Sequence, residues 1–212
     1  MRCFRSKHCG WRMESGMNKT AHGAAIGYAA FALTLWMNSM IPAGWFDPAD
    51  ATPAHLMAIV LGGCVMAAAG FLQALRGQSI DATLFLCFAA FWWVAALSAR
   101  LTVGDSPPYS PGMLGWYYIA WAFLAFCVWL AACRDGIARM LFALGLCLSL
   151  FAFALAEWLR LGALEVLGGY LGLVTAVVGI YIAAAEMVNH ASGHTILPLG
   201  EPGSEPPSKP EP

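Results

Sequence analysis

Apolar blocks about as long as a bilayer is thick recur along almost the whole chain. They cover residues 23–43, 54–75, 82–101, 114–133, 137–158 and 163–188. A helix needs about 20 residues to cross the ~30 Å hydrocarbon core of a membrane. Glycine, proline or charge marks each connection between blocks, as in the stretch GDSPPYSPG. The pattern predicts an all-α integral membrane protein, a bundle of six transmembrane helices.

The composition excludes most other classes of protein. Hydrophobic residues make up 60% of the 212 and charged residues only 11%, whereas soluble domains are nearer half apolar and a quarter charged. The net charge of −1 provides no basic surface for nucleic acid. The lipid bilayer is therefore the main expected surrounding of this chain.

The distribution of positive charge predicts the orientation. If the six windows cross the membrane, nine of the eleven Lys and Arg residues lie on the side of the N-terminus, and only Arg100 and Arg160 lie on the other side. Positive residues accumulate on the cytoplasmic side of membrane proteins. Both termini are therefore predicted to be cytoplasmic.

The two ends of the chain differ from the apolar middle. Residues 1–17 have no apolar core, so they do not form a cleavable signal, and Met13 and Met17 are alternative start positions. Residues 202–212 are rich in proline and are expected to be a disordered cytoplasmic tail. The predicted organisation is an N-terminal tail, a six-span transporter domain over residues 18–201, and this C-terminal tail.

No constellation of residues indicates catalysis or a cofactor. None of the five histidines lies deep in a predicted span, and there is no glycine-rich phosphate loop or haem-type histidine pair. Cys3, His8 and Cys9 have a spacing that fits no standard metal site. The sequence predicts a protein that is not an enzyme and needs neither metal nor cofactor.

Small residues repeat at helical spacing in the last span. Gly168, Gly172 and Ala176 are four residues apart, and Gly179 and Ala183 repeat the pattern. Such faces let helix backbones approach closely in lipid. Close approach suits a compact bundle, an oligomer interface or a narrow pore wall, and the sequence leaves these three open.

Polar groups within the spans are the candidates for handling a polar solute or a proton. No Lys or Arg falls in the middle of a predicted span, so we expect an interior without a fixed cation. Asn38 and Thr83 are uncharged candidates, with hydrogen bonding between helices as the alternative role. Glu186 lies one turn from the end of the last span. It either takes up a proton at the cytoplasmic mouth or is an interfacial acid bonded to backbone, Arg76 or Arg139.

The end of the last span carries a recognisable signature. The stretch GIYIAAAEMVNHASGHTILPLGE resembles the closing signature of the acetate uptake transporter family, the acetate/succinate–proton symporters of bacteria and their fungal relatives. The matching residues are Gly172, Leu173, Ile180, Tyr181, Ala183, Glu186, Asn189, Gly193, Thr195, Leu197, Pro198, Gly200 and Glu201. GGCVMAAAGFLQALRGQSIDATLFLCFAAFWW and GWYYIAWAFLAF resemble further spans of that family. The resemblance extends over residues 18–201.

The resemblance implies site residues. The narrowest point of the family is made by an aromatic residue, a tyrosine and a leucine. By position these correspond to Tyr28, Phe88 and Leu146, with Cys147 as the rival of Leu146. The glutamate that the family has in the second span corresponds to Gln73 here.

The entrance motif departs from the family pattern. The family opens its first span with N-P-A-P-L-G-L, whereas this chain has NKTAHGA. Asn18 and Gly23 are kept, while Lys19 and Ala21 replace the prolines and His22 replaces a leucine. Lys19 and His22 add positive or titratable charge at the entrance. We expect this charge either to attract dicarboxylates such as succinate or to make substrate release depend on pH.

The resemblance also implies a function. We expect uptake of small monocarboxylates, acetate first and with succinate or propionate as further substrates, coupled to protons through an apolar constriction. The partners implied are a small organic acid, a proton and copies of the chain itself, six in the family's known architecture, in the inner membrane of a bacterium. The alternatives are a passive channel for small neutral solutes (acetic acid, urea or ammonia) and an oligomeric membrane scaffold that transports nothing.

Overall fold

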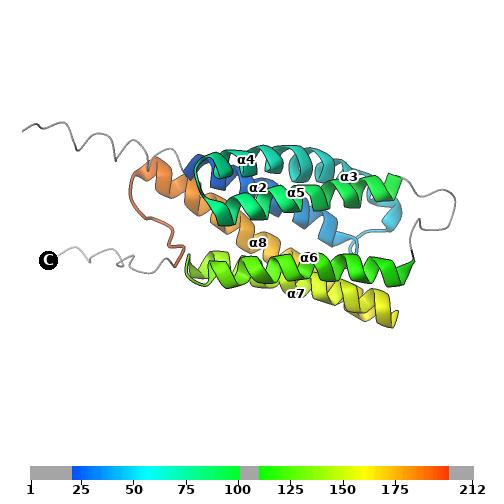
Figure 1. Cartoon of the computed structure of the whole chain (residues 1–212). Helices are drawn as coiled ribbons and strands as arrows, with labels where there is room; N and C mark the ends of the chain where they lie inside the picture. Colours follow the sequence, from blue (N-terminus) through cyan, green and yellow to red (C-terminus); the bar gives the residue numbers. More distant parts are fainter. Residues whose placement is uncertain (1–20, 101–109, 201–212) are drawn as a thin grey trace, which may run out of the picture.

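The structure is a computed structural model that describes residues 21–100 and 110–200, and every described element in it is helical (Figure 1). The elements are α2 (Ala21–Met40), η1 (Pro48–Asp50), α3 (Thr52–Met57), η2 (Ala58–Val65), α4 (Met66–Leu75), α5 (Ser79–Arg100), α6 (Pro111–Ala132), α7 (Ile137–Leu159) and α8 (Gly162–Ser192). Asn18, Lys19 and the two predicted tails lie outside the described residues.

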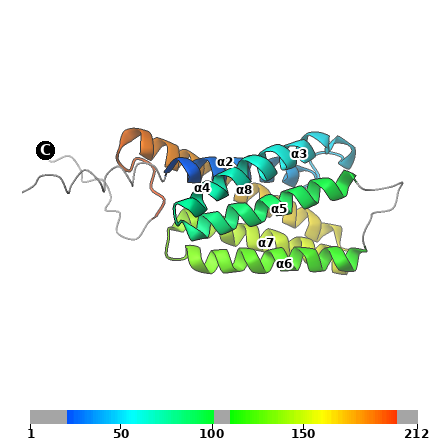
Figure 2. The same ribbon diagram turned by 45° about the horizontal axis from the view of Figure 1, so that its top comes forward.

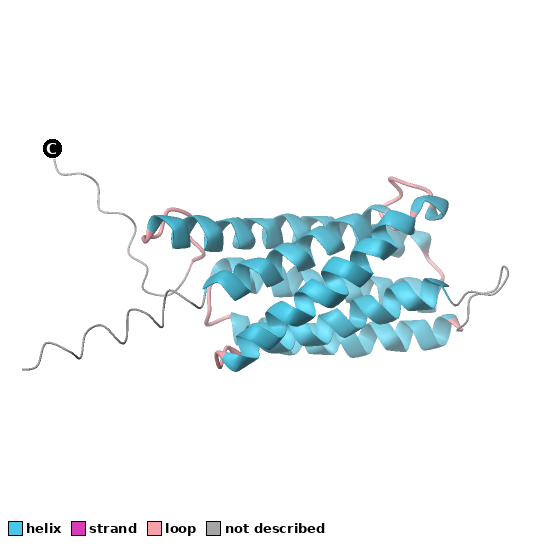
Figure 3. Ribbon diagram, turned by 90° about the horizontal axis from the view of Figure 1, so that it is seen from above, coloured by secondary structure: helices cyan, strands magenta, loops and turns pink. Residues whose placement is uncertain are grey.

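The helices lie side by side along one axis (Figures 2 and 3). Helix α2 packs chiefly on α8, α7 joins α6 to α8, and α4 with η2 packs on α5. The start of α2 and the end of α8 are at the same end of the bundle (Figure 1), which we call the inner end. The opposite end, where α2 finishes and α3 and α8 begin, is called the outer end.

Five helical segments among the described residues are long and apolar enough to cross a membrane. They are Thr52–Leu75, Ser79–Ala99, Gly112–Ala132, Ile137–Leu159 and Gly162–Ser192. These agree with the last five predicted windows. The first window, 23–43, forms the 20-residue helix α2, which is not among the five. Polar residues such as Thr34 and Asn38 dilute its apolar character, so the six-span count stays a prediction.

Large apolar side chains cover the outside of the bundle. Phe71, Phe123 and Val174 are 59%, 60% and 63% exposed, and they belong to three different helices. Exposed apolar surface on this scale marks contact with lipid or with protein rather than with water. Together with the five apolar helices, it makes the chain a multi-pass membrane protein.

Glycines of α8 allow its close packing within the chain. Gly168, Gly172 and Gly179 are all buried. A β-carbon on Gly179 would lie 2.8 Å from Phe142 on α7 and 2.9 Å from Ala32 on α2, which is closer than such atoms approach. Of the three uses that the glycine pattern left open, the compact bundle is the one seen at these positions.

The second span contains a π-helical segment, η2, between α3 and α4. Gly62 and Gly63 lie in it and are buried against aromatic rings of α5: Gly62 faces Trp92, and Gly63 faces Trp93. A π-helical turn is wide and is often found near functional sites. Here the π-helical segment packs against both α2 and α5.

The segment after α8 folds back onto the start of α7. Gly193 has a left-handed backbone and ends α8. The Asn189 side chain then accepts from the N–H groups of Ile196 and Leu197, at 2.8 and 2.9 Å, and donates to the Leu197 carbonyl at 2.8 Å. The Leu199 carbonyl accepts from the N–H of Ala138 at 3.1 Å. Much of the family-like signature therefore holds the inner ends of α7 and α8 together.

Candidate functional site

A vestibule of about 260 Å³ opens at the outer end of the bundle. This volume is below the ~300–1,000 Å³ of pockets for drug-sized ligands, so it suits a small solute. Leu35, Phe91, Trp92 and Leu146 supply apolar wall and are buried. Leu146 is one of five lining residues that also belong to the buried core, with Leu35, Phe91, Trp92 and Leu150.

The uncharged polar side chains Asn38, Ser39 and Ser149 are among those that line the vestibule. The Asn38 amide nitrogen donates to the carbonyls of Thr34 and Ala54, at 2.9 and 3.1 Å. Its side-chain oxygen has no partner among the described residues and is therefore available to a solute. Asn38, predicted as a polar candidate, thus both joins α2 to α3 and faces the vestibule.

The outer rim of the vestibule is acidic. Glu157 at the end of α7, Glu165 at the start of α8 and His55 on α3 line it, and no Lys or Arg is among its lining residues. Within the described residues no three His, Cys, Asp or Glu side chains are placed to hold a metal ion, these three included. Such a rim attracts protons or cations and repels anions.

Below Leu146, aromatic rings fill the middle of the bundle. The Phe31 ring centroid lies 5.2 Å from those of both Phe88 and Phe142, and Phe142 lies 5.4 Å from Tyr28. The four rings are at most 2% exposed. We call Phe88, Phe31, Phe142 and Tyr28 the aromatic column.

A polar cluster lies at the inner end of this column. The Tyr28 hydroxyl donates to Asp81 Oδ1 at 3.1 Å, and Gln73 Nε2 donates to Asp81 Oδ2 at 3.1 Å. Asp81 and Gln73 are 4% and 1% exposed. The Gln73 oxygen in turn accepts from Arg76 at 3.4 Å. Helices α2, α4 and α5 are thereby joined through buried polar groups.

Helices α7 and α8 complete the cluster through an arginine. Arg139 donates to Glu186 at 2.6 Å and to Asp135 at 2.9 Å, and its guanidinium carbon lies 6.0 Å from the centre of the Tyr28 ring. The prediction of an interior without a fixed cation is therefore wrong at the inner end. Arg139 belongs to the first turn of its span, and its long side chain reaches inward to meet Glu186.

The predicted constriction residues are brought together in one buried core. Tyr28, Phe88 and Leu146 occupy it on α2, α5 and α7. Leu146, rather than its rival Cys147, lines the vestibule, because the Cys147 thiol is directed at the Ala122 carbonyl of α6, 3.5 Å away.

The other predicted residues have different places. Glu186 is paired with Arg139, one of the two arginine partners that the sequence left open. Thr83 is exposed on α5 and does not join the cluster. Gly23 is buried, and a β-carbon there would lie 2.7 Å from both the Gln73 oxygen and an Arg76 nitrogen, so this glycine makes room for the polar cluster. His22 lies in the first turn of α2.

Three members of this site were not predicted from the sequence: Phe31, Phe142 and Asp81. Helical spacing contained a signal for the two rings, because Phe31 lies one turn from Tyr28 and Phe142 one turn from Leu146. Asp81 was within a stretch interpreted as a connection, whereas α5 begins at Ser79 and includes it.

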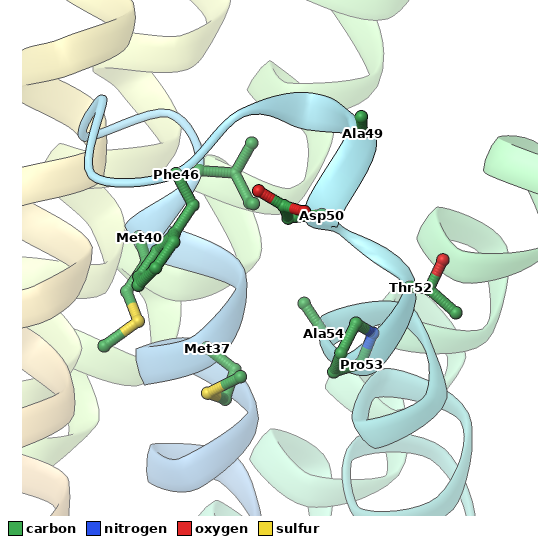
Figure 4. A pocket seen from close by; sticks show the side chains of 9 residues that line it. Met37, Met40, Phe46, Ala49, Asp50, Thr52, Pro53 and Ala54 are labelled. Carbon is green, nitrogen blue, oxygen red and sulfur yellow. The ribbon is translucent and has the colours of Figure 1, made fainter.

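A larger pocket, of about 570 Å³, lies at the outer end between the end of α2 and the η1–α3 segment. Met37, Met40, Phe46 and Pro53 give it an apolar lining, with Asp50 near its rim (Figure 4). None of the predicted site residues lines it. We therefore place the site in the vestibule and the column beneath it.

Comparisons with known proteins support the family resemblance seen in the sequence. The sequence model of the GPR1/FUN34/yaaH family matches residues 10–201. The succinate-acetate/proton symporter SatP of Escherichia coli K12 is 25% identical over 189 residues, covering 88% of this chain and 98% of SatP. The glyoxylate pathway regulator of Yarrowia lipolytica is 24% identical over 190 residues, covering 87% of this chain and 70% of the regulator.

A solved structure has the same fold. The structure of the bacterial acetate channel SatP matches with a TM-score of 0.79 and 22% identity, covering 84% of this chain and 98% of the channel. The bacterial relatives are named as a symporter and a channel, not as enzymes, as the sequence predicts for this chain. The chain belongs to the GPR1/FUN34/yaaH family.

Proposed function

We propose that this protein transports small monocarboxylates, acetate first, across a membrane. The observation that carries the proposal is the vestibule, which is lined by Leu146 and whose wall residues Phe91 and Trp92 contact the rings of Phe88 and Phe31 in the aromatic column. The symporter and channel relatives named above support the same substrate class. Succinate and propionate are further candidate substrates.

The charges along the path favour an acid that crosses together with its proton. Small carboxylic acids are ionised at neutral pH, since their pKa is near 4–5. A bare anion would meet the acidic rim and then rings that offer no counter-charge, at a cost of several kcal/mol. At the inner end Asp81, Asp135 and Glu186 give three negative charges against the two positive charges of Arg76 and Arg139. We infer proton-coupled uptake.

Six crossings with cytoplasmic termini suit this architecture. Helix α2 packs along α8, and the start of α2 lies at the same end of the bundle as the end of α8 (Figure 1), as an even number of crossings requires. We propose α2 as the sixth crossing, in the inner membrane of a bacterium, with a transporter domain over residues 18–201. The homo-oligomer, a hexamer by resemblance to the family, is part of the same proposal.

Uptake of radiolabelled acetate into proteoliposomes tests the function. We expect saturable uptake that rises when the outside is made acidic and that falls when an uncoupler collapses the gradient. Phe88→Ala opens the column and should change the rate, whereas Phe123→Ala, on the exposed face of α6, should not. Uptake that is indifferent to the pH gradient would overturn proton coupling.

The second candidate function is a passive channel for small neutral solutes, and the solved relative described as a channel favours it. A channel would conduct without saturation and would pass urea or ammonia as readily as acetic acid. Competition of labelled acetate by unlabelled succinate separately tests whether Lys19 and His22 widen the substrate range toward dicarboxylates.

A further inference from the structure

We propose that Asp81 is a positioning residue that holds Tyr28 in the aromatic column, and that proton uptake by Asp81 releases it. The proposal deepens the transport function inferred above and rests on it. It assigns the proton that accompanies the acid to a named carboxylate at the inner end of the path.

Asp81 is bonded by uncharged groups. Its two oxygens each accept one hydrogen bond from an uncharged group, the Tyr28 hydroxyl and the Gln73 amide, both at 3.1 Å. No ion pair among the described residues includes Asp81. Hydrogen bonds to a charged acceptor are roughly twice as strong as those between neutral groups. A proton on Asp81 therefore weakens its hold on the Tyr28 hydroxyl.

Tyr28 is packed between other aromatic rings. Its ring stands edge-on to Phe85 and Phe142, with centroids 5.1 and 5.4 Å away. Edge-to-face contacts stabilise the packing of the ring, and the hydrogen bond from its hydroxyl gives it a fixed direction. Asp81 is the acceptor of that bond, so it sets where the inner end of the column stands.

Other charged and titratable groups surround Asp81. They come from every helix packed on this region and are Tyr28, Arg76, Asp135, Arg139 and Glu186. Asp135 and Glu186 are both held by Arg139. Asp81 is therefore the carboxylate of this cluster whose protonation breaks no ion pair and acts directly on Tyr28.

Gln73 offers a control that moves the charge by one side chain. The family pattern has a glutamate at this position, and here Gln73 is the hydrogen-bond partner of Asp81. In the double variant Asp81→Asn/Gln73→Glu the asparagine oxygen accepts from Tyr28, and its amide donates to the new carboxylate. Total charge is kept, while the hydrogen bond between residues 73 and 81 reverses its direction.

The experiment measures acetate flux into proteoliposomes over a pH series. Total acetate is adjusted at each pH so that undissociated acid is constant, and the flux through protein-free vesicles is subtracted. We expect wild-type flux to rise roughly fivefold to tenfold toward acid pH. This factor corresponds to the difference in strength between a hydrogen bond to a charged acceptor and one to a neutral acceptor. Asp81→Asn, Tyr28→Phe and the double variant should all be fast and independent of pH, because in none of them does a carboxylate accept from a Tyr28 hydroxyl.

Two outcomes overturn the proposal: Asp81→Asn or Tyr28→Phe keeping the wild-type rise, or the double variant showing that rise although its carboxylate no longer accepts from Tyr28. Tyr28→Phe removes only a hydroxyl and keeps the ring, so it still decides the matter if Asp81→Asn does not fold. Infrared pH-difference spectra give a readout that needs no transport. A protonated carboxyl band that disappears in Asp81→Asn and shifts in Tyr28→Phe supports the assignment, and an unchanged spectrum overturns it. Absence of acetate flux in the wild type would instead count against the proposed function.

Discussion

Arg139 on α7 and Glu186 on α8 form an ion pair with 2.6 Å between Nη2 and Oε1, and their side chains are only 16% and 13% exposed. The Arg139 guanidinium carbon lies over the Tyr28 ring, 6.0 Å from its centre, and Asp81 accepts from the Tyr28 hydroxyl. Tyr28 is therefore held between a cation on its face and a carboxylate at its hydroxyl.

Removal of the arginine should cost more stability than removal of the acid's charge. Arg139→Gln leaves Glu186 and Asp135 without their cation, and breaking a buried pair in this way costs about 3 kcal/mol. Glu186→Gln keeps an oxygen that can accept from Arg139 and should cost less. Denaturant unfolding of the purified protein in detergent measures both, and the reverse order would contradict the assignment.

Asn189 should be critical for the segment that follows α8. Asn189→Ala loses three hydrogen bonds to Ile196 and Leu197, at about 1 kcal/mol each. Asn189→Asp keeps the two in which the side chain accepts. We expect limited proteolysis within residues 193–200 to be fastest for the alanine variant and intermediate for the aspartate variant. Equal rates for the wild type and Asn189→Ala would show that these bonds do not hold the segment.

Two glycines of α8 should differ sharply in their tolerance of alanine. A β-carbon on Gly169 would collide with the backbone of Pro42 and Ala43, whereas Gly162 has open space around that position. Gly169→Ala should lower stability by about 1–3 kcal/mol or separate α8 from the end of α2, and Gly162→Ala should be neutral. Thermal unfolding in detergent compares the two, and a neutral Gly169→Ala would rule out this close contact.

Leu146 should limit the size of the acid that passes. Leu146→Ala enlarges the vestibule at a buried residue of its wall, so butyrate should compete with labelled acetate more strongly than in the wild type. The stability cost of the truncation is about 2–5 kcal/mol. Leu148→Ala, at an exposed position of the same helix, is the matched control. Unchanged competition by butyrate would remove Leu146 from the path.

The sequence predicted the spans well because each is a long apolar run with a marked end. The predicted window 137–158 corresponds to Ile137–Leu159, and 54–75 corresponds to Thr52–Leu75. The last helix ends four residues later than predicted, since it continues to Ser192 before Gly193 ends it. The π-helical turn in the second span was not predicted, because no hydrophobic period distinguishes it over so short a stretch.

The site was harder to predict than the spans. Tyr28, Phe88 and Leu146 came from the resemblance, and they do share one core. Asp81 and Arg139 lie in the first turns of α5 and α7, where a sequence window cannot tell an interfacial side chain from one that turns inward. Their burial depends on helix rotation and on partners distant in the sequence, Tyr28 for Asp81 and Glu186 for Arg139.

The fold-back of the chain onto α7 has a consequence for biogenesis and for protein engineering. The N–H groups of Ile137 and Ala138 find their acceptors at Gly200 and Leu199, so a nascent chain cannot complete the start of α7 until the segment after α8 has left the ribosome. A fusion joined directly after residue 200 would disturb the hydrogen bonds between residues 199–200 and the start of α7, the helix that carries Arg139. Affinity tags for this protein are therefore better separated from that residue by a spacer.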